Sequence, residues 1–355
     1  MAVIFLNYVL PFVYKIYLYF SRLDKKTQNR IFLFLFSCQV ILIVGTRTMY
    51  TGTDTGSYLK FYNSALYYGM VEKNINYFEP LFSLIGIFCG FIGLDFTGFN
   101  IIIAFLTMLF FSLAILNSEV DAFISSVLFN SFLFSYQMMN QVRQILALMI
   151  ILYAVTLLCQ HKKKLFVIYI VFATLFHVSS LIAICLLFFP KINMAKKFLC
   201  FYIAITCIVL VSINFIFSII IKFTPYGGYL TVDDRYGAFD SDAILNLIVR
   251  IALIIIIMPF FNEIVKSKKQ EHYYHMCFIC TILQVTAIFN NAMARTTTVF
   301  FVGYMILIPK IINETKLFNE KKGVLYPLSL FSMIIYFYVY FVAKSNGFNY
   351  ESVWF

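Results

Sequence analysis

The chain has 355 residues, of which 62% are hydrophobic and only 12% charged, with 43 Phe and 25 Tyr. This composition excludes a soluble globular domain and is typical of a polytopic membrane protein. The formal net charge is +11, but Lys and Arg gather in short linkers between apolar runs, where such residues orient membrane helices. The charge therefore does not indicate nucleic-acid binding.

Apolar runs recur along the whole chain and predict an all-α polytopic integral membrane protein with about 10–12 transmembrane helices. No polar stretch between the runs is long enough to bury a core of its own. Residues 1–355 are therefore expected to form a single integral membrane domain. The expected spans are residues 2–20, 31–46, 79–94, 98–116, 122–139, 145–160, 165–189, 198–222, 244–262, 273–289, 297–312 and 324–342.

Four linkers rich in Lys and Arg are expected on the cytoplasmic side, because positively charged loops are retained there. They are residues 22–30, 191–197, 263–271 and 310–322. Both chain ends are then expected outside, together with three polar segments. These outward segments are residues 47–78, 223–243 and 290–295.

If each of the twelve apolar runs crosses the membrane once, His161-Lys162-Lys163-Lys164 lies outside and Arg143 inside. This arrangement conflicts with the rule that positively charged loops stay on the cytoplasmic side. Re-entrant segments remove the conflict and are therefore favoured. The 31–46 and 79–94 runs are short for a hydrocarbon core about 30 Å thick. The 165–189 run has His177 near its centre, followed by two serines, and a break is expected there.

A glycine-broken, hydroxyl-rich segment behind Arg47 opens the first outward loop. Gly52 permits close backbone approach, and Thr53, Asp54 and Thr55 supply one carboxylate and two hydroxyls within a single turn. Such a turn is suited to a sugar or to a phosphate-bound water. The alternative, left open by the sequence, is a solvated loop in which Asp54 caps a helix that begins near Ser57.

A second polar motif, Asn140-Gln141-Val142-Arg143-Gln144, joins two apolar runs. If the motif is helical, Asn140, Arg143 and Gln144 share one face at spacings of three and four residues. The Arg143 guanidinium is then able to bind a phosphate through two prongs, and the amides to fix a sugar hydroxyl. A snorkelling arginine at a helix end is the alternative.

Two arginines in the second half are further candidates for substrate contacts. Arg250 lies about two turns inside the span that begins at Ala243, a depth at which a charge is expected to face a polar cavity. A structural ion pair with Asp54, Glu79 or Asp242 is the alternative. Arg295 lies at the outer start of a span, between two Asn and three Thr.

Several other reaction types lack support in the sequence. His177 lies within an apolar run with no acid close behind it, so a hydrolytic triad is not expected, and the residue is a structural histidine or a general base. The sequence contains no zinc-protease, nucleophile-elbow, P-loop or dinucleotide motif. We therefore expect no cofactor and no metal. Cys277 and Cys280 are expected to be inert thiols within a span.

Four motifs taken together resemble the EpsG-like family of surface-polysaccharide polymerases. Their order and spacing match along most of the first 190 residues, and the second half matches more loosely, through Ala294-Arg295 and Ile308-Pro309. The four motifs are Arg47 with Gly52-Thr53-Asp54-Thr55-x-x-Tyr58, Tyr77-Phe78-Glu79-Pro80, Asn140-x-x-Arg143-Gln144-x-x-Ala147, and Phe176-His177-x-Ser179.

The resemblance implies a Wzy-type polymerase of capsule, exopolysaccharide or O-antigen, located as a multi-pass protein in the bacterial plasma (inner) membrane. Such enzymes transfer a growing glycan from undecaprenyl pyrophosphate to the next lipid-linked repeat unit at the outer face. The implied partners are the lipid-linked oligosaccharide, the bilayer, and the flippase and chain-length regulator of the same pathway.

On this interpretation the outward polar residues divide into two roles. Asp54 or Glu79 is better placed than His177 to take the proton of an acceptor hydroxyl. The other candidates bind substrate, with Arg143, Arg295 and Arg47 as first choices for the pyrophosphates and Arg235 and Arg250 in reserve. The remaining binding candidates are Thr53, Thr55, Tyr58, Asn140 and Gln144, and sugar specificity is expected in the 223–243 loop.

Two rival functions fit parts of the same pattern. A flippase or other membrane transporter would also be polytopic, but its site is expected near the bilayer midplane between two related halves. Here no internal repeat stands out, and the candidate charges gather on one side. An O-antigen ligase performs nearly the same chemistry on a different acceptor, and only the resemblance favours a polymerase over it.

Overall fold

The computed structural model describes residues 2–68, 79–192, 194–223, 241–268, 270–289, 294–344 and 350–352. These residues are almost entirely helical, and the β structure among them is an isolated antiparallel bridge between Arg47 and Ser352. The chain divides into two compact units. Unit 1 comprises Met1–Leu181 and Lys316–Phe355, and unit 2 comprises Ile182–Thr315.

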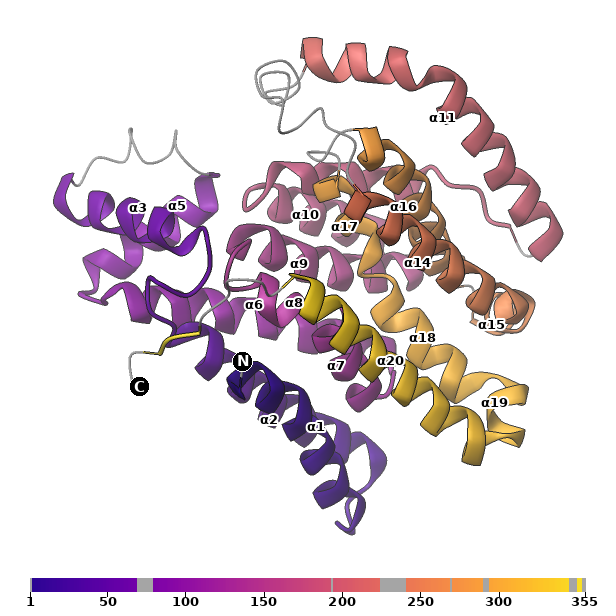
Figure 1. The fold of residues 1–355 in the computed structure, drawn as a ribbon, viewed down its shortest axis with the longest axis horizontal. Helices are drawn as coiled ribbons and strands as arrows, with labels where there is room; N and C mark the ends of the chain where they lie inside the picture. The colour runs from indigo at the N-terminus through magenta and orange to yellow at the C-terminus, as the bar shows by residue number, and fades with distance from the viewer. Residues whose placement is uncertain are drawn as a thin grey trace. The chain divides into compact units, whose positions relative to one another are not determined.

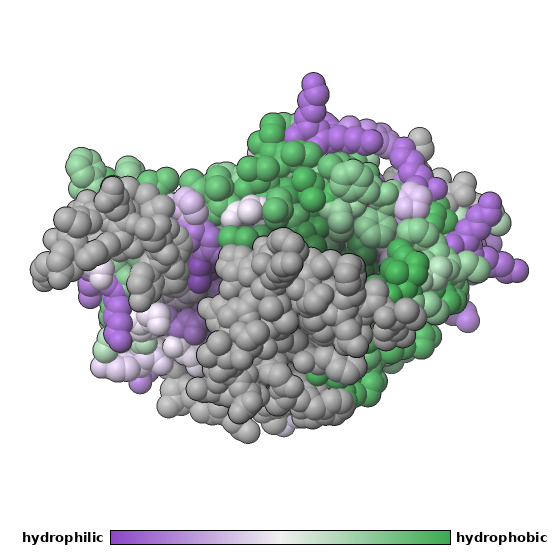
Figure 2. Space-filling view, turned by 90° about the horizontal axis from the view of Figure 1, so that it is seen from above, coloured by the Kyte–Doolittle hydropathy of each residue, from purple (hydrophilic) through white to green (hydrophobic). Residues whose placement is uncertain are grey.

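Five helices within the described ranges are long and apolar enough to cross a membrane, which confirms the all-α polytopic membrane fold. They cover Lys25–Gly45, Phe96–Ser118, Val142–Cys159, Ala243–Val265 and Ala294–Glu314. Large apolar side chains such as Phe34, Phe88 and Ile255 are exposed, and Figure 2 shows such residues over much of the described surface. Lipid is the solvent that this surface suits.

Unit 1 is built around α9 (Val142–Cys159), whose residues are nearly all buried. The helix lacks Gly and Pro and is apolar on every side, as expected of a central helix. α6 (Phe96–Ser118) and α10 (Lys163–Thr174) pack on α9, and α2 (Lys25–Gly45) packs on α6. Gly45 permits the contact between α2 and α6, since a Cβ there would lie 2.6 Å from Ile101 Cγ1.

The outer helices of unit 1 surround this centre. α1 (Ala2–Tyr19) packs on α2 and on α7 (Ala122–Ser131), and α20 (Lys322–Lys344) also packs on α7. α3 (Thr55–Tyr68) lies beside α5 (Pro80–Phe91), as Figure 1 shows. A short helix, α19 (Lys316–Glu320), precedes α20.

The expected continuous span over 122–139 is wrong. α7 ends at Ser131, Leu133 adopts a left-handed conformation with φ 58°, and α8 covers Phe134–Gln137 alone. Polar contacts hold the end of α7 against α1, because Asn130 Nδ2 donates to Asn7 O at 2.8 Å and the Ser131 hydroxyl lies 2.9 Å from the Tyr8 hydroxyl. The tertiary contacts therefore override a sequence that contains no Gly or Pro here.

The expected break in the 165–189 run is confirmed. α10 ends at Thr174, His177 lies in the interruption, and a 3-10 helix follows over Val178–Leu187. The short 79–94 run forms only the 12-residue α5. At 1.5 Å per residue that helix is about 18 Å long, too short for a hydrocarbon core of about 30 Å.

Unit 2 contains six α helices among its described residues. α16 packs against α14 and α17, and His275 of α16 lies at the centre of an aromatic cluster with Phe198 and Tyr202. Its Nδ1 lies 2.6 Å from the Tyr202 hydroxyl, and its Nε2 lies 3.1 Å from Pro190 O. The helices are α11 (Ala195–Phe223), α14 (Ser241–Ile257), α15 (Phe261–Lys268), α16 (Glu271–Phe289), α17 (Ala294–Phe301) and α18 (Tyr304–Glu314), with a 3-10 turn over Met258–Phe260.

Candidate functional site

The loop between α2 and α3 is anchored from inside by Arg47. The Arg47 side chain is 1% exposed and donates through Nη1 to Val44 O at 2.6 Å and through Nη2 to Asn100 Oδ1 at 3.2 Å. Its Nε lies 3.5 Å from the Thr55 hydroxyl. These contacts tie both ends of the loop to α6.

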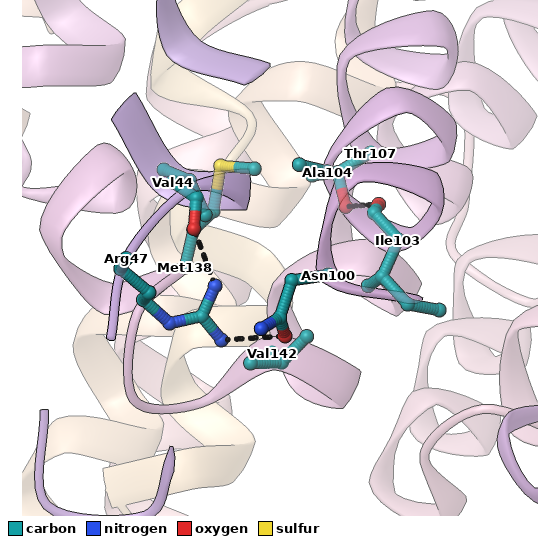
Figure 3. A pocket seen from close by; sticks show the side chains of 8 residues that line it. All are labelled: Val44, Arg47, Asn100, Ile103, Ala104, Thr107, Met138 and Val142. Carbon is teal, nitrogen blue, oxygen red and sulfur yellow. Dashed lines mark hydrogen bonds between the residues drawn. The ribbon is translucent and has the colours of Figure 1, made fainter. Parts of the chain in front are cut away.

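The Arg47 guanidinium lies in a narrow pocket whose other walls are mostly aliphatic (Figure 3). Burial lowers the pKa of Arg47 to about 10, so the group still carries its charge at neutral pH. The guanidinium is held by neutral oxygens, a placement suited to a structural role. The pocket is lined by Val44, Arg47, Asn100, Ile103, Ala104, Thr107, Met138 and Val142.

The loop is also fastened to the turn before α9. Thr53 N donates to Asn140 Oδ1 at 2.7 Å, and the Thr55 hydroxyl donates to Met139 O at 3.0 Å. Gly52 lies over this turn with φ +90°, and a Cβ there would lie 2.5 Å from Asn140 Oδ1. Only glycine fits this approach.

The expected helical face of Asn140, Arg143 and Gln144 does not form, because α9 begins at Val142. Asn140 precedes the helix and uses its side-chain oxygen to hold the Thr53 amide. Gln144 is buried within α9 at 3% exposure. Of the three, Arg143 alone is a half-buried residue of the first helical turn.

Asp54 immediately precedes α3, which begins at Thr55, two residues earlier than expected. Its backbone carbonyl accepts from Ser57 N at 3.0 Å and from Tyr58 N at 3.1 Å, so it starts the helix. Its half-buried carboxylate accepts from the Thr53 hydroxyl at 3.2 Å. A carboxylate at this end of a helix is stabilised by the helix dipole.

A charged cluster forms where α5 begins. Glu79 is the N-cap residue of α5, but its side chain does not cap the helix. One carboxylate oxygen accepts from Arg143 Nη1, and the other lies 3.1 Å from His177 Nδ1. We refer to Glu79, Arg143, His177 and Tyr58 as the Glu79 cluster.

Arg143 is held in the cluster by aromatic rings as well as by charge. Its guanidinium carbon lies 6.0 Å from the centre of the Tyr58 ring and 5.9 Å from that of Phe82. Such contacts stabilise a cation over an aromatic face. The Arg143 side chain remains 22% exposed, compared with 11% for the Glu79 side chain and 9% for that of His177.

Opposing effects act on the Glu79 carboxyl. Burial raises its pKa, but the hydrogen bond with His177 and the charge of Arg143 outweigh burial and lower the pKa from its ordinary 4.5 to about 2. Glu79 is therefore ionised at every physiological pH. With Nδ1 directed at Glu79, His177 leaves Nε2 buried and without a hydrogen-bond partner among the described residues.

The arginine candidates of unit 2 have different surroundings. Arg250 is 7% exposed, donates from Nη1 to Cys280 O at 3.1 Å, and lies 5.2 Å from the centre of the Phe301 ring. Arg295 is exposed in the first turn of α17. Arg235, and nearly all of the 223–243 loop in which it lies, fall outside the described residues.

Three residues that shape the site were not singled out from the sequence. Asn100 binds Arg47, Phe82 lies under Arg143, and Thr51 is fully buried in the loop. An asparagine inside an apolar helix is a recognisable signal, because polar residues within spans are costly and usually have a partner. Phe82 and Thr51 have no comparable signal.

We predict that Glu79→Gln lowers the free energy of unfolding by roughly 3 kcal/mol at neutral pH, because it leaves Arg143 without its carboxylate. The lowered pKa means that the contribution of the ionised group is fully present above about pH 4.5 and is lost as the pH falls toward about 2. Thermal unfolding of both proteins in detergent, from pH 7 down to about pH 3, measures the difference.

The difference in thermal stability between wild type and Glu79→Gln should become smaller as the pH is lowered. The matched change Glu119→Gln, at an exposed glutamate, should show little gap at any pH. A Glu79→Gln gap that stays constant across the range would contradict the ionised pair.

We predict that Gly52→Ala destabilises the protein more than Gly93→Ala. Both glycines have positive φ, +90° and +76°, so both variants incur a conformational cost of about 1 kcal/mol. Only at Gly52 does the new Cβ also collide with Asn140 Oδ1, whereas nothing lies within 4 Å at Gly93. Equal losses of thermal stability in the two variants would show that the close approach at Gly52 is unimportant.

One family of known proteins matches this chain. No curated protein and no solved structure matches the chain. The model of the EpsG family matches residues 29–352, which include the loop anchored by Arg47, the Glu79 cluster and the three arginines of unit 2. Since the match covers nearly the whole sequence, this chain belongs to the EpsG family, a family of Wzy-like polysaccharide polymerases.

Proposed function

We propose that this protein polymerises lipid-linked oligosaccharide repeat units at the outer face of the bacterial plasma membrane. The growing glycan passes from undecaprenyl pyrophosphate to the next lipid-linked unit, in the synthesis of capsule, exopolysaccharide or O-antigen. One observation supports this most strongly: all four motifs of the family resemblance converge in unit 1. Glu79, Arg143 and His177 meet in one cluster, and Thr53 binds Asn140.

The proposed reaction forms one glycosidic bond and breaks one glycosyl phosphate bond. An acceptor sugar hydroxyl attacks the anomeric carbon of the donor, its proton goes to a base, and undecaprenyl pyrophosphate leaves with the bonding electron pair. Negative charge therefore develops on the leaving oxygen. A fixed cation beside that oxygen lowers the barrier, because it is already oriented when the charge appears.

Arg143 is the residue proposed to meet the leaving pyrophosphate. Its guanidinium is oriented by Glu79 through Nη1 and by the rings of Tyr58 and Phe82, yet its side chain is 22% exposed. A planar guanidinium contacts two phosphate oxygens at once, which an ammonium does not. Arg250, Arg295 and Arg235 are proposed as further pyrophosphate contacts from the second half of the chain.

Glu79 is proposed as a positioning residue and not as the base. Its two carboxylate oxygens contact Arg143 and His177, and its lowered pKa makes it a poor proton acceptor. His177 is proposed to be fixed by the same carboxylate. The sequence analysis named Glu79 as a candidate base, whereas on this proposal Glu79 orients Arg143 and His177.

Asp54 is proposed as the base that takes the acceptor proton. Its carboxylate is half-buried, and the loop that presents it is fixed at Thr53 by Asn140. Arg47 and Thr55 are proposed to hold that loop, since Arg47 is buried and its donors bind Val44, Asn100 and Thr55. Direct contact between Arg47 and pyrophosphate stays a prediction.

The test of the function is reconstitution with lipid-linked repeat units extracted from a strain that lacks this gene. We predict that such a strain accumulates single units and no long polymer. Purified wild-type protein in vesicles should then convert those units to long chains, and Arg143→Lys should lose at least tenfold in rate, because Lys keeps the charge but not the two-pronged contact.

Three outcomes would count against the proposal. Units confined to the cytoplasmic side of the deletion strain would favour a flippase. Transfer of glycan to a lipid-A acceptor without growth of the chain would favour a ligase. A wild-type polymerisation rate in Arg143→Lys would contradict the proposed two-pronged contact with pyrophosphate, because it would show that only charge is required at that position.

We predict that Asp54→Asn lowers the polymerisation rate about 10²-fold or more while both lipid substrates still bind, the usual effect of losing a general base. Asn caps a helix about as well as Asp, so the start of α3 should survive the change. Rates and binding of the purified variant, measured with the same extracted units, separate the two roles. Full activity would remove Asp54 from the chemistry and direct attention to His177.

A further inference from the structure

Residues 350–352 lie against the loop that presents Asp54, although about 300 positions of sequence separate the two segments. Ser352 and Arg47 form an antiparallel bridge, and Thr48 N donates to Glu351 O at 2.9 Å. We refer to residues 350–352 as the strap. It is continuous with neither α2 nor α3, so its contacts with the loop are entirely tertiary.

Each residue of the strap contacts the end of α2 or the loop that follows it. The Tyr350 hydroxyl donates to Ile43 O at 2.8 Å, near the end of α2. At the other end of the strap, the Ser352 hydroxyl lies 3.3 Å from that of Thr46. Ser352 is 6% exposed, so this junction is shielded from solvent.

Thr51 is the central contact between strap and loop. Its hydroxyl accepts from Glu351 N at 2.7 Å and lies 3.0 Å from Glu351 O, and the residue is fully buried. The Thr51 carbonyl in turn accepts from the Thr55 hydroxyl at 2.6 Å. A chain of hydrogen bonds therefore runs from the strap through Thr51 to the first residue of α3, and Asp54 is the residue directly before it.

We propose that the strap is a positioning segment for the catalytic loop, which it holds in the conformation that presents Asp54 to the acceptor. This proposal rests on the proposed polymerase function. Arg47 and Asn140 each hold the loop through hydrogen bonds, and the strap adds a third attachment at Thr51. Loss of the strap should impair turnover more than substrate binding, because the arginines that bind phosphate are unchanged.

The backbone of the strap, and not the Glu351 side chain, makes the important contacts. The Glu351 side chain is exposed, and its contact with the Thr48 hydroxyl is long at 3.4 Å. The Glu351 amide and carbonyl make the short contacts with Thr51 and Thr48. This difference supplies a matched pair of variants: Thr51→Val removes a hydroxyl that holds the strap, and Glu351→Ala removes only the exposed side chain.

The test measures hydrogen exchange of the peptide that contains residues 46–54. We expect exchange at least tenfold faster in Thr51→Val, and in a chain ended after Asn349, than in wild type or Glu351→Ala. In the reconstituted assay, Thr51→Val and the shortened chain should lose at least tenfold in kcat with KM changed less than twofold. Thr51→Ser, which restores the hydroxyl, should recover both the protection and kcat.

Exchange is read without any polymerisation, so failure of this inference is distinguishable from failure of the proposed function. Unchanged exchange in the shortened chain overturns the strap, whatever the protein catalyses. Faster hydrogen exchange in Thr51→Val and in the shortened chain, with kcat unchanged, overturns the role of the strap in turnover.

Crosslinking keeps the inference testable if Thr51→Val fails to insert. A Thr46→Cys, Ser352→Cys double variant should form a disulfide, identified by mass spectrometry of the linked peptides, because the two native hydroxyls lie 3.3 Å apart. Absence of that crosslink under mild oxidation would also overturn the inference.

Discussion

The shared carboxylate of Glu79 is the interaction on which the arrangement of unit 1 depends. A carboxylate with little exposure is costly unless it is paired, and here Arg143 and His177 occupy its two oxygens. Because those partners come from α9 and from the break after α10, the pairing fixes the start of α5 against both. The Tyr58 ring beside Arg143 then connects α3 to the same point.

The charges of Arg47 and Arg143, two arginines with little exposure, are stabilised in two different ways. Arg143 is balanced by the Glu79 carboxylate, and its side chain keeps partial exposure. Arg47 is buried among neutral oxygens of Val44, Asn100 and Thr55, so its charge serves the loop. The two arginines therefore differ in the partners that stabilise their charges: an ionised carboxylate for Arg143 and uncharged oxygens for Arg47.

Hydropathy predicted the all-α membrane fold, and α2, α6 and α9 lie close to their expected ranges because a long apolar run has few other stable forms in lipid. Sequence also indicated Glu79, Arg143 and His177, but not their contact, which depends on how the helices fold back on one another. The break at Leu133 was missed, since packing decides it. The sequence left open whether Asn140 and Arg143 share a helix, and α9 begins only at Val142. The strap has no local sequence signal at all.

The short helix α5 has a consequence for how the chain is threaded through the bilayer. At the start of α5, Glu79 pairs with Arg143 in the first turn of α9. Just after its end, Leu94 O accepts a hydrogen bond from the Tyr62 hydroxyl of α3. The chain then enters α6, where Asn100 accepts from Arg47. The start of α5 therefore contacts α9 and its end contacts α3, and the 12-residue helix is too short to add a crossing of its own between residues 79 and 95. Arg143 and Lys162-Lys163-Lys164 lie at opposite ends of α9. With the crossing by residues 79–94 removed from the count, the lysines are expected on the same side as the other linkers rich in Lys and Arg, and the conflict with the positive-inside rule that the sequence raised no longer arises.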